Sequence, residues 1–134
     1  MKNPFSIGDQ KEHKLIVDAS MFARFDSGLV HPVYSTFALC KDAEWAGRLF
    51  VLDMLEEGEE GIGTQVEIEH LGPALEGEVV TITARLEEVS DREIVCSFEA
   101  RVAERLVAKG KTGQKIVRKA RFDAYLATLR DQQA

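Results

Sequence analysis

The stretch that decides the fold is Ser35-Thr-Phe-Ala-Leu-Cys-Lys-Asp-Ala-Glu-Trp-Ala-Gly-Arg-Leu-Phe-Val-Leu-Asp-Met-Leu55. Apolar side chains recur in it at helical spacing, and Gly47 is its one helix-breaking residue. The breadth of the apolar face predicts a helix of about twenty residues that is covered on most sides. Glu57-Gly58 follow, and a glycine suits the position just after a helix end.

Downstream of Gly61-Ile-Gly63 the apolar period changes from 3.6 to 2, which is the period of strands. A tight hairpin turn is expected at Ser90-Asp91, and the glycines Gly110 and Gly113 predict a bulge or a close backbone approach. An amphipathic helix around Phe122, Tyr125, Leu126 and Leu129 closes the chain. The expected strands are 11–18, 64–70, 78–88, 92–103 and 105–118.

Between the first strand and the long helix we expect a short helical turn followed by a loop. Ser20 would cap the turn, and Asp26 to Pro32 contains the glycine and proline typical of a loop. Within the long helix, Lys41 and Asp42 are the residues expected to face solvent.

Alternating strands joined by short turns predict an antiparallel sheet with one buried face. The long helix is the element able to cover that face, so the fold class is α+β, with a curled sheet wrapped around one helix. The 134 residues suit a single domain over 1–134. One helix cannot cover five strands and one sheet edge stays open, so we expect a homodimer.

The composition limits the possible partners and compartment. A net charge of −6 and a pI of about 5.1 argue against a nucleic-acid partner. Neither a signal peptide nor a membrane span is expected. Cys40 and Cys96 are expected to be buried thiols in a reducing compartment. The expected location is therefore cytoplasmic. The last third of the chain is basic, which suits a solvated face or the phosphates of a nucleotide-bearing substrate.

Two ionisable side chains are predicted to point into the apolar layer between helix and sheet. His70 is in phase with Val66 and Ile68 on a strand, and Glu44 lies in a largely apolar part of the helix. Each has a structural alternative, a satisfied core histidine or a solvated helix carboxylate. Together they can supply a general base and an orienting partner for water, which is why we take them as candidate catalytic residues.

Thr36 is the third candidate because it falls at the expected start of the helix. Ser35 and Thr36 are both good N-caps, a structural role, but free N–H groups of a first helical turn can also hold a developing oxyanion. Eight residues separate Thr36 from Glu44, or about 12 Å along a straight helix, so the two cannot touch. Either Thr36 lies on an irregular entry turn or the site is completed across a dimer interface.

These residues resemble the fluoroacetyl-CoA-specific thioesterase-like family of the hotdog superfamily over nearly the whole chain. The matching stretches are His31-Pro-Val-Tyr-Ser-Thr36, Glu44-Trp45-Ala46, Leu55 to Gly61, and Gly63-Thr64 leading to His70. The resemblance implies hydrolysis of a small acyl-CoA thioester in a homodimer, with no metal and no cofactor besides the CoA of the substrate. It assigns catalysis to Thr36, Glu44 and His70, and substrate contacts to Gly63, Val30 and Tyr34.

The chain departs from the family in two places. It reads Gly110-Lys-Thr-Gly-Gln114 where relatives carry a histidine-containing motif, and Val30 stands where the family has the aromatic residue linked to fluoroacetyl selectivity. Generic thioester hydrolysis is therefore expected rather than the fluorinated substrate. The alternatives are an acyl-CoA or small-ligand binding protein without turnover, an enoyl-CoA hydratase, and a purely structural dimer.

Overall fold

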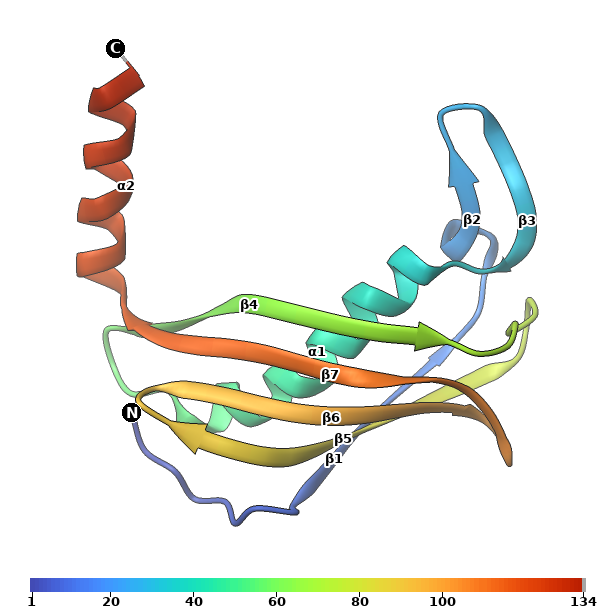
Figure 1. The fold of residues 1–134 in the computed structure, drawn as a ribbon, viewed down its shortest axis with the longest axis horizontal. Coiled ribbons are helices and arrows are strands. Elements are labelled where there is room, and N and C mark those ends of the chain that lie inside the picture. The colour runs from blue at the N-terminus through green and yellow to red at the C-terminus, as the bar shows by residue number, and fades with distance from the viewer. Residues whose placement is uncertain (134) are drawn as a thin grey trace.

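A computed structural model describes residues 1–133. Within them a five-stranded antiparallel sheet, in the order β1-β5-β6-β7-β4, curls around one long helix, and β2 and β3 form a separate two-stranded sheet (Figure 1). This confirms the expected α+β class. The elements are β1 (Gln10–Ile16), the 3-10 turn η1 (Ala19–Met21), β2 (Phe22–Phe25), β3 (Gly28–Tyr34), α1 (Thr36–Met54), β4 (Glu59–His70), β5 (Val79–Ser90), β6 (Glu93–Val102), β7 (Arg105–Arg118) and α2 (Lys119–Gln133).

The long helix α1 forms where its apolar pattern predicts. Ser35 is the N-cap, and its side chain accepts a hydrogen bond from the Ala38 N–H at 3.1 Å. The helix lies across the concave face of the sheet and buries one broad face against it (Figure 1). The buried residues of α1 are Leu39, Ala43, Ala46, Gly47, Phe50, Val51 and Met54.

Close packing of α1 on the sheet, and of β7 against β4, depends on residues that lack a large side chain. At Gly47 an added Cβ would lie 2.5 Å from Oγ1 of Thr112 on β7. At Gly110 an added Cβ would overlap the backbone carbonyl oxygen of Glu67, which confirms the expected close approach. Gly113 faces a register shift in β4 between Gly63 and Gln65, so the expected bulge lies on the neighbouring strand.

Two predicted boundaries are wrong by a few residues. The β5–β6 turn is Asp91-Arg92 rather than Ser90-Asp91, since both central residues have positive φ (48° and 69°), as a two-residue hairpin turn requires. β4 begins at Glu59, so Gly61 and Gly63 lie within the strand and not before it. Their missing side chains concealed the period of two.

The predictions for the segment before α1 differ most from the structure. Asp18, not Ser20, caps the η1 turn, accepting from the Ser20 N–H at 2.8 Å. Phe22–Phe25 and the supposed loop form the β2–β3 hairpin, which turns at Gly28 with φ 112°. Strands of four and seven residues with shifted register are too short and irregular to show a period of two.

The sheet has two different edges. β1 is short, whereas β4 is the longer edge, with twelve residues. Figure 1 shows α2 and the β2–β3 hairpin both standing beyond the β4 edge, at its opposite ends. The open edge expected from the sequence is therefore long and framed by two projections.

Candidate active site

The first component of the site is a direct contact between Thr36 and His70. Thr36 is the first residue of α1, and His70 is the last residue of β4. Oγ1 of Thr36 lies 2.9 Å from Nδ1 of His70. Depending on the tautomer, the hydroxyl donates to Nδ1 or the protonated Nδ1 donates to the hydroxyl. The structure thus joins two of the candidate catalytic residues, 34 positions apart in the sequence.

The surroundings of His70 favour its neutral form. Burial lowers the pKa of this imidazole below its usual value, and a weaker interaction with the backbone of Gly72 acts in the opposite direction. Nε2 is buried and has no hydrogen-bond partner among residues 1–133. A neutral imidazole whose Nδ1 is fixed by a hydroxyl is suited to accept or relay a proton.

The start of α1 adds hydrogen-bond donors beside this pair. Ser35 accepts from the N–H of Ala38 through its side chain and from that of Leu39 through its carbonyl. Helix geometry and this cap leave two N–H groups of the first turn without a hydrogen-bond acceptor, those of Thr36 and Phe37. They lie at the positive end of the helix dipole and can stabilise negative charge on a carbonyl oxygen.

The second component of the site is the contact between Glu44 and Gly63. A Cβ added to Gly63 would collide with Oε1 of Glu44, so the carboxylate lies directly over the backbone of β4. Glu44 is half-buried, and Gly63 is exposed. The family resemblance implied that the glycine contacts substrate. In the structure it admits the carboxylate, and contact with substrate stays a prediction.

Two further residues hold this part of α1 in place, and sequence reasoning missed both. Arg48, one turn after Glu44, donates to the Gly61 carbonyl at 3.0 Å. Gln114 is buried on β7 and donates through Nε2 to the backbone carbonyl of Glu44 at 3.2 Å. In the sequence Gln114 stands out only because it departs from the family's motif, which predicts no contact with Glu44. The available signal was the Gly61–Gly63 spacing, which puts two missing side chains on one strand face beneath the helix.

The two components do not meet within one chain. Thr36 begins a regular helix, so the irregular entry turn considered as one alternative is excluded. On β4, Gly63 and His70 are seven residues apart, about 23 Å in an extended strand. Among residues 1–133 Glu44 makes no hydrogen bond or ion pair with His70. Within one chain the partner of His70 is Thr36, and a meeting of Glu44 with His70 stays a prediction for two copies.

The structure places Tyr34 in the core, and its contact with substrate stays a prediction. Its side chain is fully buried, and its hydroxyl donates to Oδ2 of Asp42 at 2.6 Å. Desolvation, and then this hydrogen bond, raise the pKa of the phenol far above its usual range. Asp42, expected to face solvent, is thus partly buried and also lies 3.7 Å from Nε2 of His13. Tyr34 therefore anchors the hairpin to α1.

Val30 lies on β3 and is 49 % exposed. Other exposed apolar side chains lie on the same hairpin and on the first turn of α1, where the rings of Phe25 and Phe37 meet edge to face with centroids 5.8 Å apart. A role for Val30 in substrate contact stays a prediction. The structure places it on the exposed surface of β3 rather than in the core.

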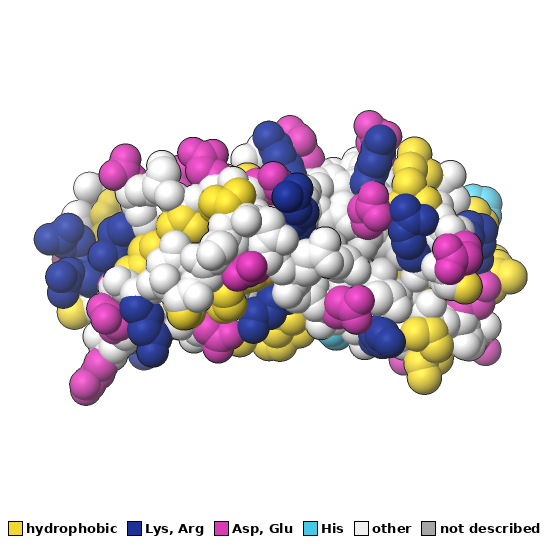
Figure 2. Space-filling model, turned by 90° about the horizontal axis from the view of Figure 1, so that it is seen from below, with side chains coloured by type: hydrophobic (Ala, Val, Ile, Leu, Met, Phe, Trp, Pro, Cys, Tyr) yellow, Lys and Arg dark blue, Asp and Glu magenta, His cyan; other side chains and the backbone are white. Residues whose placement is uncertain are grey.

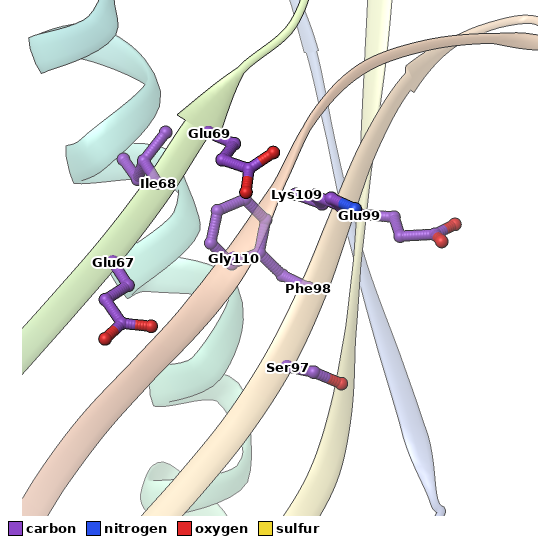
Figure 3. Close-up of a pocket in the computed structure, with 8 residues that line it drawn as sticks. All are labelled: Glu67, Ile68, Glu69, Ser97, Phe98, Glu99, Lys109 and Gly110. Atoms are coloured by element: carbon purple, nitrogen blue, oxygen red, sulfur yellow. The ribbon is translucent and has the colours of Figure 1, made fainter.

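Two surface pockets lie away from these residues. The one drawn in Figure 3, of about 500 Å³, lies on the side of the sheet that faces away from α1 and is lined by Glu67, Glu69 and Glu99 against a single Lys109. Its negative charge makes it a poor place for an acyl-CoA. A basic pocket of about 440 Å³ is lined by Arg92, Lys115, Arg118 and Arg121 together with Asp91, Ile116 and Val117.

Among residues 1–133, no group of three or more His, Cys, Asp or Glu side chains is arranged to hold a metal ion. In the same range no helix has the length and apolar character needed to cross a membrane.

The curled sheet around one helix defines the class of the protein as a hotdog fold. Among solved structures the chain is similar to a hot-dog-like protein from Thermanaerovibrio acidaminovorans, with 22 % identity, 92 % of each chain covered and a TM-score of 0.85. It is similar to the fluoroacetyl-CoA thioesterase FlK at 22 % identity over 94 % of this chain and 98 % of that one, with a TM-score of 0.86.

Sequence comparison then gives the family. The model of the fluoroacetyl-CoA-specific thioesterase family (FlK) matches residues 17–120, so the chain belongs to this family of thioester hydrolases. A Thermus thermophilus hypothetical protein, described as a thioesterase superfamily member, is 38 % identical over 97 % of this chain and 96 % of its own, with a TM-score of 0.92. No curated protein matches the sequence.

Proposed function

We propose that the protein hydrolyses a small acyl-CoA thioester at a site shared between two copies of the chain. The observation that carries the proposal is the separation of two reactive pairs along one free strand edge. Thr36 and His70 lie at one end of β4, and Glu44 and Gly63 lie toward the other. Family membership supports the reaction class, and the geometry supports the sharing.

A two-fold axis crossing β4 between Gly63 and His70 would bring the pairs together. Antiparallel pairing of β4 with β4 of a second copy runs the two strands in opposite directions. Glu44 of one copy then approaches Thr36 and His70 of the other. The same pairing would satisfy the backbone groups that the edge leaves exposed. The β4 edge is long and has glycines on the face toward α1, so it can accept a strand without crowding the helix.

Each residue then has a role in attack on the thioester carbonyl. The N–H groups at the start of α1 would stabilise the oxyanion. Glu44 would act as base for water or as nucleophile, and the Thr36–His70 pair would position the carbonyl and pass a proton to the departing CoA sulfur. Water adds to the acyl carbon and the C–S bond breaks, which gives the free acid and CoA thiol. This chemistry uses water and side chains, without a cofactor.

The basic pocket is the surface best suited to the phosphates of CoA. Lys115, Arg118 and Arg121 line it, whereas Arg92 is paired with Glu59. β7 pairs with β4 so that Lys115 lies opposite Ile62. In the proposed dimer this end of one copy faces the Thr36–His70 end of the other. Reversing Arg118 and Arg121 to glutamate is expected to raise KM for acyl-CoA about tenfold, with a weaker salt dependence.

Thiol release from a panel of acyl-CoA esters tests the hydrolysis. Glu44→Gln and His70→Gln should each lower kcat/KM by at least about a hundredfold, because each removes a proton-transfer group without changing the shape of the site. Acyl-CoA binding by calorimetry with no thiol release would contradict hydrolysis and favour the binding protein. Hydration of an enoyl-CoA without thiol release would favour the hydratase.

Mixing the two inactive variants tests the sharing. If Glu44 and His70 of one site come from different copies, hybrid dimers contain one intact site and random exchange restores about a quarter of the wild-type activity. If both residues of a site come from one copy, no intact site forms. Mixing Glu44→Gln with Thr36→Val chains should restore activity as well, whereas mixing His70→Gln with Thr36→Val should not.

A further inference from the structure

The closing helix α2 presents an apolar stripe of exposed and half-buried side chains. α2 projects from the end of β7 and buries none of its residues within residues 1–133 (Figure 1). Phe122, Tyr125, Leu126 and Leu129 lie along one side of it at helical spacing, and Tyr125 is 58 % exposed. An ordinary solvated helix does not need such a stripe.

The β2–β3 hairpin is the second apolar projection. Phe25, Leu29 and Val30 on it are each about half exposed. The hairpin joins the body beside the Thr36–His70 pair, through the Ser35 N–H, which donates to the Met21 carbonyl at 2.8 Å, and through the start of α1. Whatever covers the hairpin also covers one approach to that pair.

The two projections are fixed at opposite ends of β4. The N–H of Lys119, the first residue of α2, donates to the Gly58 carbonyl at 2.9 Å, just before β4 begins. The hairpin stands by His70, where β4 ends. Both extend to the same side of the sheet, beyond the β4 edge (Figure 1). A rotation of 180° about a two-fold axis that passes through the middle of β4 exchanges the two ends of the strand.

We propose that α2 of a second copy packs along the β2–β3 hairpin and covers one approach to the Thr36–His70 pair. The proposal rests on the β4-mediated dimer of the proposed function. In that dimer α2 of each copy lies at the same end of the paired β4 strands as the hairpin of the other copy. Their lengths agree, since fifteen helical residues span about 22 Å and seven strand residues span about 24 Å.

The other sheet edge is a poorer place for a second copy. β1 has seven residues and carries Lys11, Glu12 and Lys14, and Lys11 is already paired with Asp53 of α1. Charged side chains, lysine above all, discourage pairing at an edge strand. The view from the β1 side shows acidic and basic side chains interspersed over that face (Figure 2). A copy bound there would also leave α2 and the hairpin uncovered.

Cross-linking between two differently marked chains tests the proposal. One full-length chain carries Leu29→Cys and an affinity tag, and the other carries Leu129→Cys, both with Cys40→Ser; Cys96 is buried and stays. After mixing, a short bismaleimide should join tagged to untagged chains. Val30→Cys replaces Leu29→Cys in a second series, because neighbouring strand residues face opposite ways.

Ala127→Cys is the matched control, since Ala127 is exposed on the opposite side of α2. Rapid linkage to position 129 from either hairpin position, with at least about tenfold slower linkage to position 127, supports the proposal. Equal rates, no linkage at all, or a protein that sediments as a monomer overturn it.

Charge substitution gives a second measurement that does not depend on cysteine placement. Tyr125→Asp with Leu129→Asp should speed amide exchange in residues 22–34 and raise the dimer Kd at least about tenfold. Ala124→Asp with Ala127→Asp should change neither, and equal effects of the two pairs would overturn the proposal. Subunit mixing of the Glu44 and His70 variants reports on catalysis separately. Recovery there without cross-linking leaves the proposed function intact and removes only the α2 contact.

Discussion

The two ends of β4 place different chemistry against α1. Near its start the strand has glycines, and α1 lies so close that the Glu44 carboxylate occupies the space of a Gly63 side chain. At its end the strand has His70, which reaches the first residue of the helix through a hydrogen bond. The first end holds a carboxylate against bare backbone, and the second holds an imidazole against a hydroxyl. A site that needs all of them must combine the two ends.

The largest effect expected from this comparison is at the glycine end. Gly63→Ala should lower kcat/KM about a hundredfold, because its Cβ would displace the Glu44 carboxylate from the site. Gly61→Ala is the control. Its Cβ would lie 2.5 Å from Cγ1 of Val51 and should cost stability, about 1–3 kcal/mol, rather than turnover. Thiol-release kinetics and thermal unfolding of both variants make the comparison. Comparable activity losses in the two would contradict it.

At the histidine end, removing the Thr36 hydroxyl should have the next largest effect. Thr36→Val keeps the shape but loses the contact with Nδ1 of His70, and kcat should fall about tenfold to a hundredfold. Thr36→Ser should retain most of the rate. Ser35→Ala separates capping from chemistry, since losing the cap should lower the free energy of unfolding by about 1 kcal/mol. A Thr36→Val enzyme that turns over normally would remove Thr36 from the mechanism.

The pH dependence should report the state of His70. Because burial lowers its pKa, the imidazole is neutral at pH 7 and is protonated only at a pH below about 6.5. Below its pKa, kcat/KM should fall about tenfold per pH unit, since the protonated ring cannot accept a proton. Profiles of kcat/KM against pH measure this limb. An acid limb centred above pH 6.5 would conflict with the burial of the ring.

The smallest effect is expected where the structure assigns a supporting role. Tyr34→Phe removes the donor to Asp42 and should lower the free energy of unfolding by about 1–2 kcal/mol, while KM stays unchanged. Tyr125→Phe, on an exposed side chain, is the control and should change stability by less than about 0.5 kcal/mol. Chemical denaturation measures both. A higher KM in Tyr34→Phe without loss of stability would instead support contact of Tyr34 with substrate.

The fold was predictable where local pattern and tertiary structure agree. The helix over 35–55 and the strands over 78–118 emerge with small boundary shifts, because their apolar periods are long and regular. The β2–β3 hairpin was missed, since it is short, irregular and held by Tyr34 and the bridge between Val33 and Leu75. A period cannot reveal pairing that depends on contacts forty residues away.

The sequence by itself determined which residue types face the layer between helix and sheet, and that Thr36 and Glu44 cannot meet on one helix. The tertiary structure alone decided which of these side chains contact each other. Within one chain His70 contacts Thr36, Gly63 receives a carboxylate, and Tyr34 is buried. The physical reason is that period and helical rise fix direction and spacing within one element. The placement of β4 along α1 is set by packing around Gly61 and Gly63, and depends on the whole sheet.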